Sequence, residues 1–561
     1  MHADFWNDKR PAGVPTALDI TRYASVVEVF EHACQRFADR PAFSNLGLTL
    51  SYADLDRHSA AFAAWLQQNT SLKPGDRIAV QLPNVLQYPI AVFGAMRAGL
   101  VVVNTNPLYT AREMRHQFRD AGVRALVYLN LFGDRVQEVQ ADSGIEYLIE
   151  ARLGDLLPSA KGWLVNLLVD KVKKMPAYHL PQALSFKQVL RDGRRLRHTP
   201  IPQTKADIAV LQYTGGTTGP AKGAMLTHGN LVANMLQVLA CFAQHGVDGQ
   251  PMIEEGREVM IAPLPLYHIY AFTANCMCMV ATGNHNVLIS NPRDIPAFVK
   301  ELGKWRFSAL LGLNTLFVAL MDHPGFKSLD FSALKVTNSG GTALVKATAE
   351  RWEQVTGCRI VEGYGLTETS PVASTNPYGQ MARLGTVGVP VVGTAFKVID
   401  EQGHEQPLGS PGELCIQGPQ VMKGYWQQPA ATADTLDADG WLKTGDIAVI
   451  DPDGFTRIVD RKKDMIIVSG FNVYPNEVED VVMGHPQVAN CAAIGVADER
   501  TGEAVKLFVV AREGGVDVED LKAYCKANLT AYKVPRQIVV REALPMTPVG
   551  KILRRELRDS A

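Results

Sequence analysis

Tyr213-Thr214-Gly215-Gly216-Thr217-Thr218-Gly219-Pro220-Ala221-Lys222-Gly223 is the stretch that decides how this chain is interpreted. It directly follows Ile208 to Tyr213, an apolar run that predicts a strand. Its glycines let backbone N–H groups approach phosphate oxygens, its threonines add hydroxyl donors, and Lys222 adds a positive charge. The pattern is not a Walker A loop, because no G-x-x-x-x-G-K-[ST] occurs. We therefore predict a phosphate-binding turn; the alternative is a plain flexible glycine-rich loop.

Strand and helix signals alternate on both sides of this turn. Before it, three buried strands are predicted, separated by two helices, and Thr110 is placed to cap the second helix. After it, a helix is expected to begin near Thr227, and two further strands flank the helical stretch Leu344 to Thr356. The pattern predicts a mostly parallel sheet covered by helices. The strands before the turn are Arg77 to Leu82, Leu100 to Val103 and Ala125 to Leu129.

The 561 residues exceed the ~250–300 that a single core supports, so we expect several units. After residue 385, short β runs separated by Gly and Pro predict a small barrel or β-rich unit. The charged segment Asp460-Arg461-Lys462-Lys463-Asp464 has the character of a domain joint, and the strands and helix beyond it predict a compact α+β domain. We expect a large domain over 1–460, with units near 1–200, 201–384 and 385–460, and a small domain over 461–561.

Composition excludes several classes of protein. Lys and Arg (56) balance Asp and Glu (57), so there is no electrostatic case for nucleic acid as a partner. The 8 cysteines form no CxxC pair, which argues against a zinc site and favours reduced thiols. The first residues lack the apolar core of a signal peptide. The apolar stretch Ala271 to Gly283 is shorter than the ~20 residues that span a bilayer.

Six further short motifs follow the turn at 213–223. They are Pro265-Leu266-Tyr267-His268, Ser339-Gly340-Gly341-Thr342, Glu362-Gly363-Tyr364-Gly365-Leu366-Thr367-Glu368, Thr444-Gly445-Asp446, the joint at 460–464 and Pro548-Val549-Gly550-Lys551. With these seven motifs in this order, the chain resembles the adenylate-forming enzymes, the superfamily of acyl-CoA synthetases, peptide-synthetase adenylation domains and luciferases. The resemblance covers nearly the whole chain, with one small departure at Pro220-Ala221 that leaves Lys222 in place. It implies an α/β fold: a large N-terminal domain of stacked parallel-type sheets with helices and a small β-barrel-like unit, and a mobile small α+β domain.

The resemblance also implies roles for individual residues, with ATP, Mg²⁺ and coenzyme A as cofactor and cosubstrates. It implies catalytic roles for Lys551, Thr214, Glu368 and His268, and a Mg²⁺ site at Thr214 and Glu368. It implies hinge and coenzyme A roles for Lys463, Ser469, Gly470 and Phe471. The residues implied for ATP and AMP binding are Thr214, Gly215, Gly216, Thr217, Thr218, Gly219, Lys222, Gly341, Thr342, Glu362, Gly363, Tyr364, Gly365, Thr367, Asp446, Ile458 and Arg461.

The chemistry of these residue types agrees with the implied roles. When a carboxylate attacks the α-phosphorus of ATP, two anions meet, which requires positive charge and a metal. Glu368 suits Mg²⁺, Asp446 can accept from two ribose hydroxyls, and Lys551 carries its charge on a long stem. Each has an ordinary alternative: a loop carboxylate for Glu368, a capped turn for Asp446, a surface salt bridge for Arg461 and a solvated tail charge for Lys551.

In this family the small domain rotates after the first step. Lys551 then leaves the site, the segment Ser469 to Val473 approaches the thiol tunnel, and Lys463 lies at the residue whose backbone torsions change. Such a conformational step often sets turnover.

Two apolar segments bear on the substrate. The run Ile269 to Leu288 could line an acyl tunnel or be ordinary core, and the pattern leaves both open. In residues 156–180, an apolar set recurs at helical spacing among lysines, which is typical of a helix on a membrane surface or of one packed on its own domain. The apolar residues are Trp163, Leu164, Leu167, Leu168 and Val172, and the lysines are Lys161, Lys171, Lys173 and Lys174.

The segment 154–180, Pro263 to Ala271 and Gly283-Asn284-His285-Asn286 resemble the bacterial long-chain fatty-acid–CoA ligases. That resemblance implies a long-chain fatty acid as substrate, a role in fatty acid degradation, and a cytoplasmic location with peripheral contact with the membrane. Relatives often dimerise, so a homodimer is left open.

Rival functions share most of these motifs. An acyl-AMP ligase serving a carrier protein and a medium-chain acyl-CoA ligase are the nearest. A catalytically silent nucleotide- or lipid-binding protein and a luciferase-like oxygenase are further alternatives. A serine hydrolase and a dinucleotide oxidoreductase are disfavoured, because neither G-x-S-x-G nor a strand-linked G-x-G-x-x-G occurs.

Overall fold

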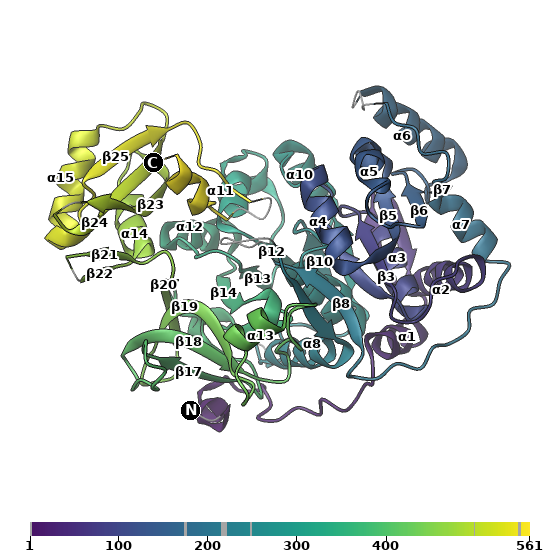
Figure 1. Ribbon diagram of the computed structural model, residues 1–561, viewed down its shortest axis with the longest axis horizontal. Coiled ribbons are helices and arrows are strands. Elements are labelled where there is room, and N and C mark those ends of the chain that lie inside the picture. The colour runs from purple at the N-terminus through teal and green to yellow at the C-terminus, as the bar shows by residue number, and fades with distance from the viewer. Residues whose placement is uncertain are drawn as a thin grey trace.

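A computed structural model describes residues 3–172, 177–214, 221–246, 249–469, 471–498, 500–547 and 551–560. Figure 1 shows two helix-covered sheets on one side of the molecule, a small antiparallel sheet below, and a separate C-terminal domain at the other end.

The first large sheet has seven strands in the order β7-β6-β5-β3-β4-β8-β9, and all neighbours are parallel except β8 and β9. The second of its helices, α4, begins at a capping residue: the side chain of Thr110 accepts from Glu113 N. The strands are β3 Arg77–Gln81, β4 Val101–Asn104, β5 Val123–Leu129, β6 Tyr147–Ala151, β7 Leu184–Ser185, β8 Ile208–Tyr213 and β9 Gly223–Thr227. The helices are α3 Gln87–Arg97, α4 Ala111–Ala121, α5 Gly133–Gln140, α6 Ser159–Val172 and α7 Phe186–Gly193.

The second large sheet has nine strands in the order β16-β15-β14-β13-β12-β10-β11-β1-β2, parallel from β14 to β1 and antiparallel at both ends. The strands are β1 Pro41–Asn45, β2 Leu48–Ser51, β10 Val259–Ala262, β11 His285–Leu288, β12 Ala309–Gly312, β13 Val336–Ser339, β14 Ile360–Gly365, β15 Val372–Thr375 and β16 Val389–Pro390. The helices are α1 Val26–Arg36, α2 Tyr52–Asn69, α8 His228–Phe242, α9 Ile269–Ala271, a π-helix Phe272–Met279, α10 Ile295–Leu302, α11 Asn314–Asp322 and α12 Lys346–Thr356.

The two large sheets exchange strands across residue 200. β1 and β2 come early in the chain but join the second sheet, because β1 pairs in parallel with β11. β8 and β9 come after residue 200 but join the first sheet, because β8 pairs with β4. The sheets therefore do not divide at the expected limit between units at 200 and 201.

The β-rich unit is a four-stranded antiparallel sheet in the order β17-β18-β19-β20. β17 and β20 stand at its two edges, so of the two predicted forms, a small barrel or a β-rich unit, the structure has an open β-rich sheet. An N-terminal 3-10 helix, Ala3–Lys9, packs against it, and Trp6 Nε1 donates to Gly454 O at 3.0 Å. The strands are β17 Ala395–Ile399, β18 Pro411–Gln417, β19 Leu442–Ile450 and β20 Thr456–Arg461, with α13 Pro429–Thr435 between β18 and β19.

The C-terminal domain has a sheet and core of its own. Its buried apolar residues, from Ile466 to Leu557, cluster with one another. The predicted fold class, a large α/β domain followed by a small α+β domain, is confirmed. The strands are β21 Ile466–Val468, β22 Phe471–Val473, β23 Val488–Asp498, β24 Gly502–Ala511 and β25 Gln537–Arg541, and the helices are α14 Pro475–Met483, α15 Val518–Asn528 and α16 Arg554–Asp559.

The segment Gly283-Asn284-His285-Asn286, singled out in the sequence, has a structural role. Asn284, His285 and Asn286 are buried, and His285 Nε2 lies 2.8 Å from Ser44 Oγ while Asn275 Nδ2 donates to Asn286 Oδ1 at 2.9 Å. These contacts tie the start of β11 to β1 and to the π-helix. Among the described residues, no helix has both the length and the apolar character needed to cross a membrane.

Candidate active site

Residues from all seven motifs line one cavity of about 2550 Å³ between the large sheets, the β-rich unit and the C-terminal domain. Parallel strands end at this edge, which is where open α/β sheets place their ligand sites. The cavity thus brings together segments more than 300 residues apart, from Thr214 to Lys551.

The flanks of the glycine- and threonine-rich turn are fixed by the antiparallel pair β8–β9. Thr214 N donates to Lys222 O at 3.0 Å, which closes the base of the turn. Helix α4 secures both sides: Tyr213 Oη donates to Asp120 Oδ2 at 2.5 Å, and His116 Nε2 lies 2.8 Å from Ala221 O. The predicted site residues Gly215, Gly216, Thr217, Thr218 and Gly219 lie outside the described residues.

Glu368 lies in a 3-10 turn, Thr367–Thr369, directly after β14. Its Oε1 accepts from Tyr425 Oη at 2.7 Å, and Lys222 Nζ lies 5.0 Å from the centre of the Tyr425 ring. Tyr425 therefore links the predicted metal ligand to the predicted phosphate lysine. Burial, and then the charge of Glu368, raise the pKa of Tyr425, so its hydroxyl remains a donor.

The donor set fits Mg²⁺ when substrate phosphates complete it. In the part of the chain that the structure describes, no group of three or more His, Cys, Asp or Glu side chains could hold a metal. Mg²⁺ is commonly bound through one or two carboxylates together with phosphate oxygens. Glu368 and Thr214, which both line the cavity, supply oxygens of this kind.

Asp446 is buried between two donors. Tyr364 Oη donates to its Oδ2 at 2.5 Å, and Arg461 Nε lies 2.7 Å from its Oδ1. Burial raises the pKa of Asp446, and Arg461 opposes that shift. Asp446 and Arg461 face each other across β19 and β20, so the sheet itself sets this pair.

The end of β14 carries Glu362, Gly363, Tyr364 and Gly365 along the cavity wall. Glu362 Oε1 accepts from Leu344 N at 3.2 Å, and burial raises its pKa to about 7. Gly365 is required by packing, because an ideal Cβ there would lie 1.9 Å from Pro371 O.

Lys551 reaches the cavity from the C-terminal domain. A Cβ placed on Gly341, which has a φ of +87°, would lie 3.9 Å from Lys551 Cε, so the lysine stem passes over the loop of Gly341 and Thr342. Thr547 N donates to Lys551 O at 2.7 Å, and Lys551 N donates to Thr547 Oγ1 at 3.0 Å. These two bonds present the side chain to the large domain.

His268 caps the short helix α9 and lines the same cavity. Its Nδ1 accepts from Tyr270 N at 3.3 Å. Burial, and then the nearby Lys551, lower its pKa to about 4, so the imidazole is neutral at pH 7. A neutral ring can donate and accept hydrogen bonds without adding charge.

Two of the residues predicted for coenzyme A, Ser469 and Phe471, are not brought to this cavity. Ser469 and Phe471 are absent from its lining; Phe471 is 56% exposed and stacks on Tyr532 with ring centres 4.8 Å apart. Gly470 lies outside the described residues. Lys463, Ile458 and Thr367 do line the cavity.

Tyr425 and Glu413 line the cavity although no sequence motif indicated them. Tyr425 and Glu413 bind Glu368 and Lys462, which lie 57 and 49 residues away. Neither belongs to a recognisable phosphate, metal or base pattern, so no local signal pointed to them.

Two family models match the chain: "AMP-binding enzyme" over residues 30–426 and "AMP-binding enzyme C-terminal domain" over residues 477–551. The chain belongs to the AMP-binding enzyme family. It is 50% identical to the long-chain-fatty-acid–CoA ligase of Escherichia coli O6:H1 over 99% of this chain and 98% of that protein. It is 36% identical to that of Bacillus subtilis (strain 168) over 99% and 97%. Within the AMP-binding family, the chain belongs with the bacterial long-chain-fatty-acid–CoA ligases.

Solved structures of AMP-binding enzymes share the fold. ATP-bound MatB from Rhodopseudomonas palustris has a TM-score of 0.81 at 26% identity and covers 95% of this chain and 98% of its own. The anthranilate CoA ligase AuaEII has a TM-score of 0.83 at 22% identity, which supports the fold alone.

Proposed function

We propose that this protein is an ATP- and Mg²⁺-dependent long-chain fatty acid:CoA ligase. It forms a fatty acyl-AMP with release of pyrophosphate and then transfers the acyl group to the thiol of coenzyme A, giving acyl-CoA and AMP. The observation that carries the proposal is the position of Lys551, which the C-terminal domain holds in the same cavity as Glu368, Asp446 and Arg461.

The large domain binds the nucleotide in this proposal. Asp446 accepts from the ribose hydroxyls, Tyr364 lies against the adenine, and the turn ending at Lys222 binds the phosphates. Glu368 and Thr214 would hold Mg²⁺, which would neutralise phosphate charge. The support is that these side chains share one wall of the cavity and are already oriented by protein partners.

Lys551 serves the first step. The oxygen of the fatty carboxylate attacks the α-phosphorus, and the bond to the pyrophosphate oxygen breaks. A lysine charge between the two anions stabilises the transition state more than the separated substrates, which is how such a contact accelerates a reaction. His268 is neutral beside Lys551, and because its Nδ1 accepts from Tyr270 N, its Nε2–H is free to donate a hydrogen bond to the carboxylate.

The second step requires a different face of the C-terminal domain. The coenzyme A sulfur attacks the acyl carbon and AMP leaves. Ser469 and Phe471, which lie away from the cavity while Lys551 is in it, would approach after rotation at Lys463. Two roles on one rigid domain therefore imply two orientations of that domain.

The acyl chain has an apolar wall available next to the nucleotide site. α8 contributes Val238 and Phe242, the π-helix contributes Thr273 and Ala274, and Tyr378 faces the same space. A cavity lined in this way suits a long hydrocarbon chain, because burial of each CH₂ contributes ~0.8 kcal/mol.

Peripheral contact with a membrane surface is the remaining part of the proposal. α6 stands at the outer edge of the molecule (Figure 1) and exposes Trp163, Leu164 and Leu168 at 67%, 49% and 51%. Its inner side is held by Gly162 against Gly154 and by Asn166, which accepts from Gly154 N at 2.8 Å. An apolar face that its own domain does not cover is typical of a helix that lies on a bilayer.

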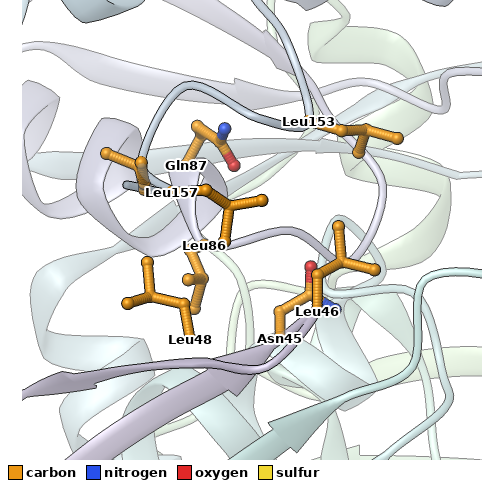
Figure 2. Close-up of a pocket in the computed structure, with 8 residues that line it drawn as sticks. Asn45, Leu46, Leu48, Leu86, Gln87, Leu153 and Leu157 are labelled. Atoms are coloured by element: carbon orange, nitrogen blue, oxygen red, sulfur yellow. The ribbon is translucent and has the colours of Figure 1, made fainter. Parts of the chain in front are cut away.

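The chain before α6 lines a small hollow of the domain. Figure 2 shows a small hollow lined by Leu46, Leu86, Leu153 and Leu157, between the β1–β2 turn and the segment that leads into α6. Lys161 Nζ donates to Leu46 O at 3.2 Å and ties α6 to that turn. None of these residues lines the large cavity, so the α6 surface is separate from the chemistry.

Exchange of labelled pyrophosphate into ATP tests the first step, and consumption of coenzyme A with palmitate, ATP and Mg²⁺ tests the second. Both are expected to depend on added fatty acid. Exchange without coenzyme A consumption would instead indicate an acyl-AMP ligase for a carrier protein. A rate that peaks with hexanoate or octanoate would indicate a medium-chain ligase. The proposal fails if no fatty acid supports exchange.

A further inference from the structure

Glu413, in β18 at the wall of the cavity, holds two segments of the active site together. Its Oε1 accepts from Gly445 N at 3.2 Å, and its Oε2 lies 2.8 Å from Lys462 Nζ. The Glu413 side chain is 11% exposed, so its charge is nearly removed from water and depends on these partners.

The two partners of Glu413 flank the Asp446–Arg461 pair. Gly445 immediately precedes Asp446, and Lys462 immediately follows Arg461. Lys462 N also donates to Gly445 O at 2.9 Å. The carboxylate of Glu413 thus fixes both chain segments that carry the proposed ribose contacts, without touching the cavity face of Asp446.

On the other side of the joint, the chain is bound to the C-terminal domain. Asp464 is buried, and its Oδ1 lies 2.7 Å from Arg558 Nη2 and its Oδ2 3.6 Å from Arg554 Nη1, both on α16. Lys463 therefore lies between Lys462, whose side chain binds the large domain, and Asp464, whose side chain binds the small domain.

One further contact crosses the joint and holds the present orientation. Asn476 N, at the start of α14, donates to Asp460 Oδ2 at 2.7 Å. A rotation of the small domain about Lys463 would break this bond. The Glu413–Lys462 pair would remain, because both of its members precede Lys463.

We propose that Glu413 is a positioning residue that anchors the fixed side of the hinge. It holds Lys462 so that rotation is confined to Lys463, and it keeps Asp446 and Arg461 in place while the small domain moves. This inference rests on the proposed two-step function. It goes beyond that function because it assigns a role to Glu413 and Lys462. The role follows from geometry, since one carboxylate on β18 binds both the Gly445 turn and the hinge segment.

The test compares Glu413→Gln, Lys462→Met and the double variant in the two half-reactions measured separately. These are palmitate-dependent pyrophosphate exchange, and thioester formation from supplied palmitoyl-AMP and coenzyme A. Each single variant is expected to raise the KM for ATP and to lower both half-reaction rates about 10-fold. The double variant is expected to match the singles, because all three remove one shared interaction.

The Glu258–Lys335 pair provides a matched control. Lys335 Nζ lies 3.1 Å from Glu258 Oε1, the side chains are 38% and 2% exposed, and neither residue lines the cavity. Lys335→Met is expected to change melting temperature but neither half-reaction. If Lys462→Met behaves as Lys335→Met does, the pair is an ordinary salt bridge and the inference is overturned.

Trypsin gives a readout that does not depend on turnover. Glu413→Gln retains every lysine and arginine of the joint, and it is expected to be cleaved after Lys462 or Lys463 at least about threefold faster than the wild type, because local opening governs cleavage. Equal cleavage rates together with wild-type kinetics would overturn the inference. Wild-type protein that lacks pyrophosphate exchange would instead contradict the proposed function, so the two failures are distinct.

Discussion

Lys551 is held between groups that act on its charge in opposite directions. Burial lowers the pKa of Lys551, and Arg461 lowers it further, whereas Asp446 and Glu368 oppose the shift. The charged form of a lysine in such surroundings is stabilised most when new negative charge arrives beside it. The carboxylate and the α-phosphate of the proposed first step bring that charge.

Lys551→Ala is expected to reduce palmitate-dependent pyrophosphate exchange by about 10²–10³. Thioester formation from supplied palmitoyl-AMP should be largely spared, because Lys551 acts only in the first step. Lys522→Ala, which changes a lysine on α15 outside the cavity, should leave both rates unchanged. Equal loss of both half-reactions in Lys551→Ala would contradict the role given to Lys551.

The pH dependence of the first step should carry the signature of this lysine. Only the charged form is active, so kcat/KM for exchange is expected to fall as pH rises through a pKa below the ordinary lysine value of about 10.4. In Lys551→Arg the guanidinium stays charged, so this alkaline limb should move to higher pH although the rate is lower. If kcat/KM falls over the same alkaline pH range in both proteins, the fall must be caused by a group other than Lys551.

The position of the π-helix Phe272–Met279 shows why its sequence allowed two interpretations, tunnel lining and ordinary core. Thr273 and Ala274 line the cavity, while Cys276 to Met279 are buried in the core. The run is therefore cavity wall along one side and core along the other, and an all-apolar pattern cannot separate the two. π-Helical turns are often found at functional sites.

Ala274→Phe is expected to shorten the acyl chains that the cavity accepts. Ala274 is buried beside the cavity, so a phenyl ring there must project into the space assigned to the acyl chain. Turnover with oleate should fall at least about 10-fold while turnover with hexanoate changes less than about twofold. The measurement is a rate profile from hexanoate to oleate, with Thr273→Ser as the control of conserved size. An unchanged profile would place the acyl chain elsewhere.

Local sequence signals predicted the helices and strands well. They could not predict which distant strands pair or which distant residues meet in the site. Thr110 and Thr227 both begin helices with capping boxes, as their sequence context indicates. The pairing of β1 with β11 joins Phe43 to Asn286, and no local pattern encodes that partner. The same holds for the site: the seven linear motifs marked its walls, but Tyr425 and Glu413 are defined by partners distant in the sequence.

At the scale of the whole molecule, the C-terminal domain presents one of its two proposed working faces. Lys551 is in the cavity, and Phe471 is outside it. The Asp460–Asn476 bond and the ion pairs of Asp464 connect this orientation to the joint. Under the proposed function, these contacts must rearrange in each turnover, whereas the apolar core within each domain need not change.

The far edge of the large domain, at α6, gives a prediction that is independent of the chemistry. A triple change of Trp163, Leu164 and Leu168 to Ser should lower partition onto phospholipid vesicles at least about 10-fold, because the exposed apolar face of α6 is lost.

A second triple change, of Lys171, Lys173 and Lys174 to Glu, should weaken binding to anionic vesicles only. Lys173 and Lys174 lie outside the described residues. Coflotation with vesicles of phosphatidylcholine, with and without phosphatidylglycerol, separates these effects.

Ile467 and Val540 supply the matched control for the α6 surface. They are 48% and 46% exposed on the C-terminal domain, and their change to Ser should leave partition unaltered. The variant of Trp163, Leu164 and Leu168 should keep wild-type turnover with detergent-dispersed palmitate, because none of these residues lines the cavity. If the α6 variant binds vesicles as the wild type does, its apolar face has another partner and the membrane contact must be withdrawn, while the ligase activity would stand.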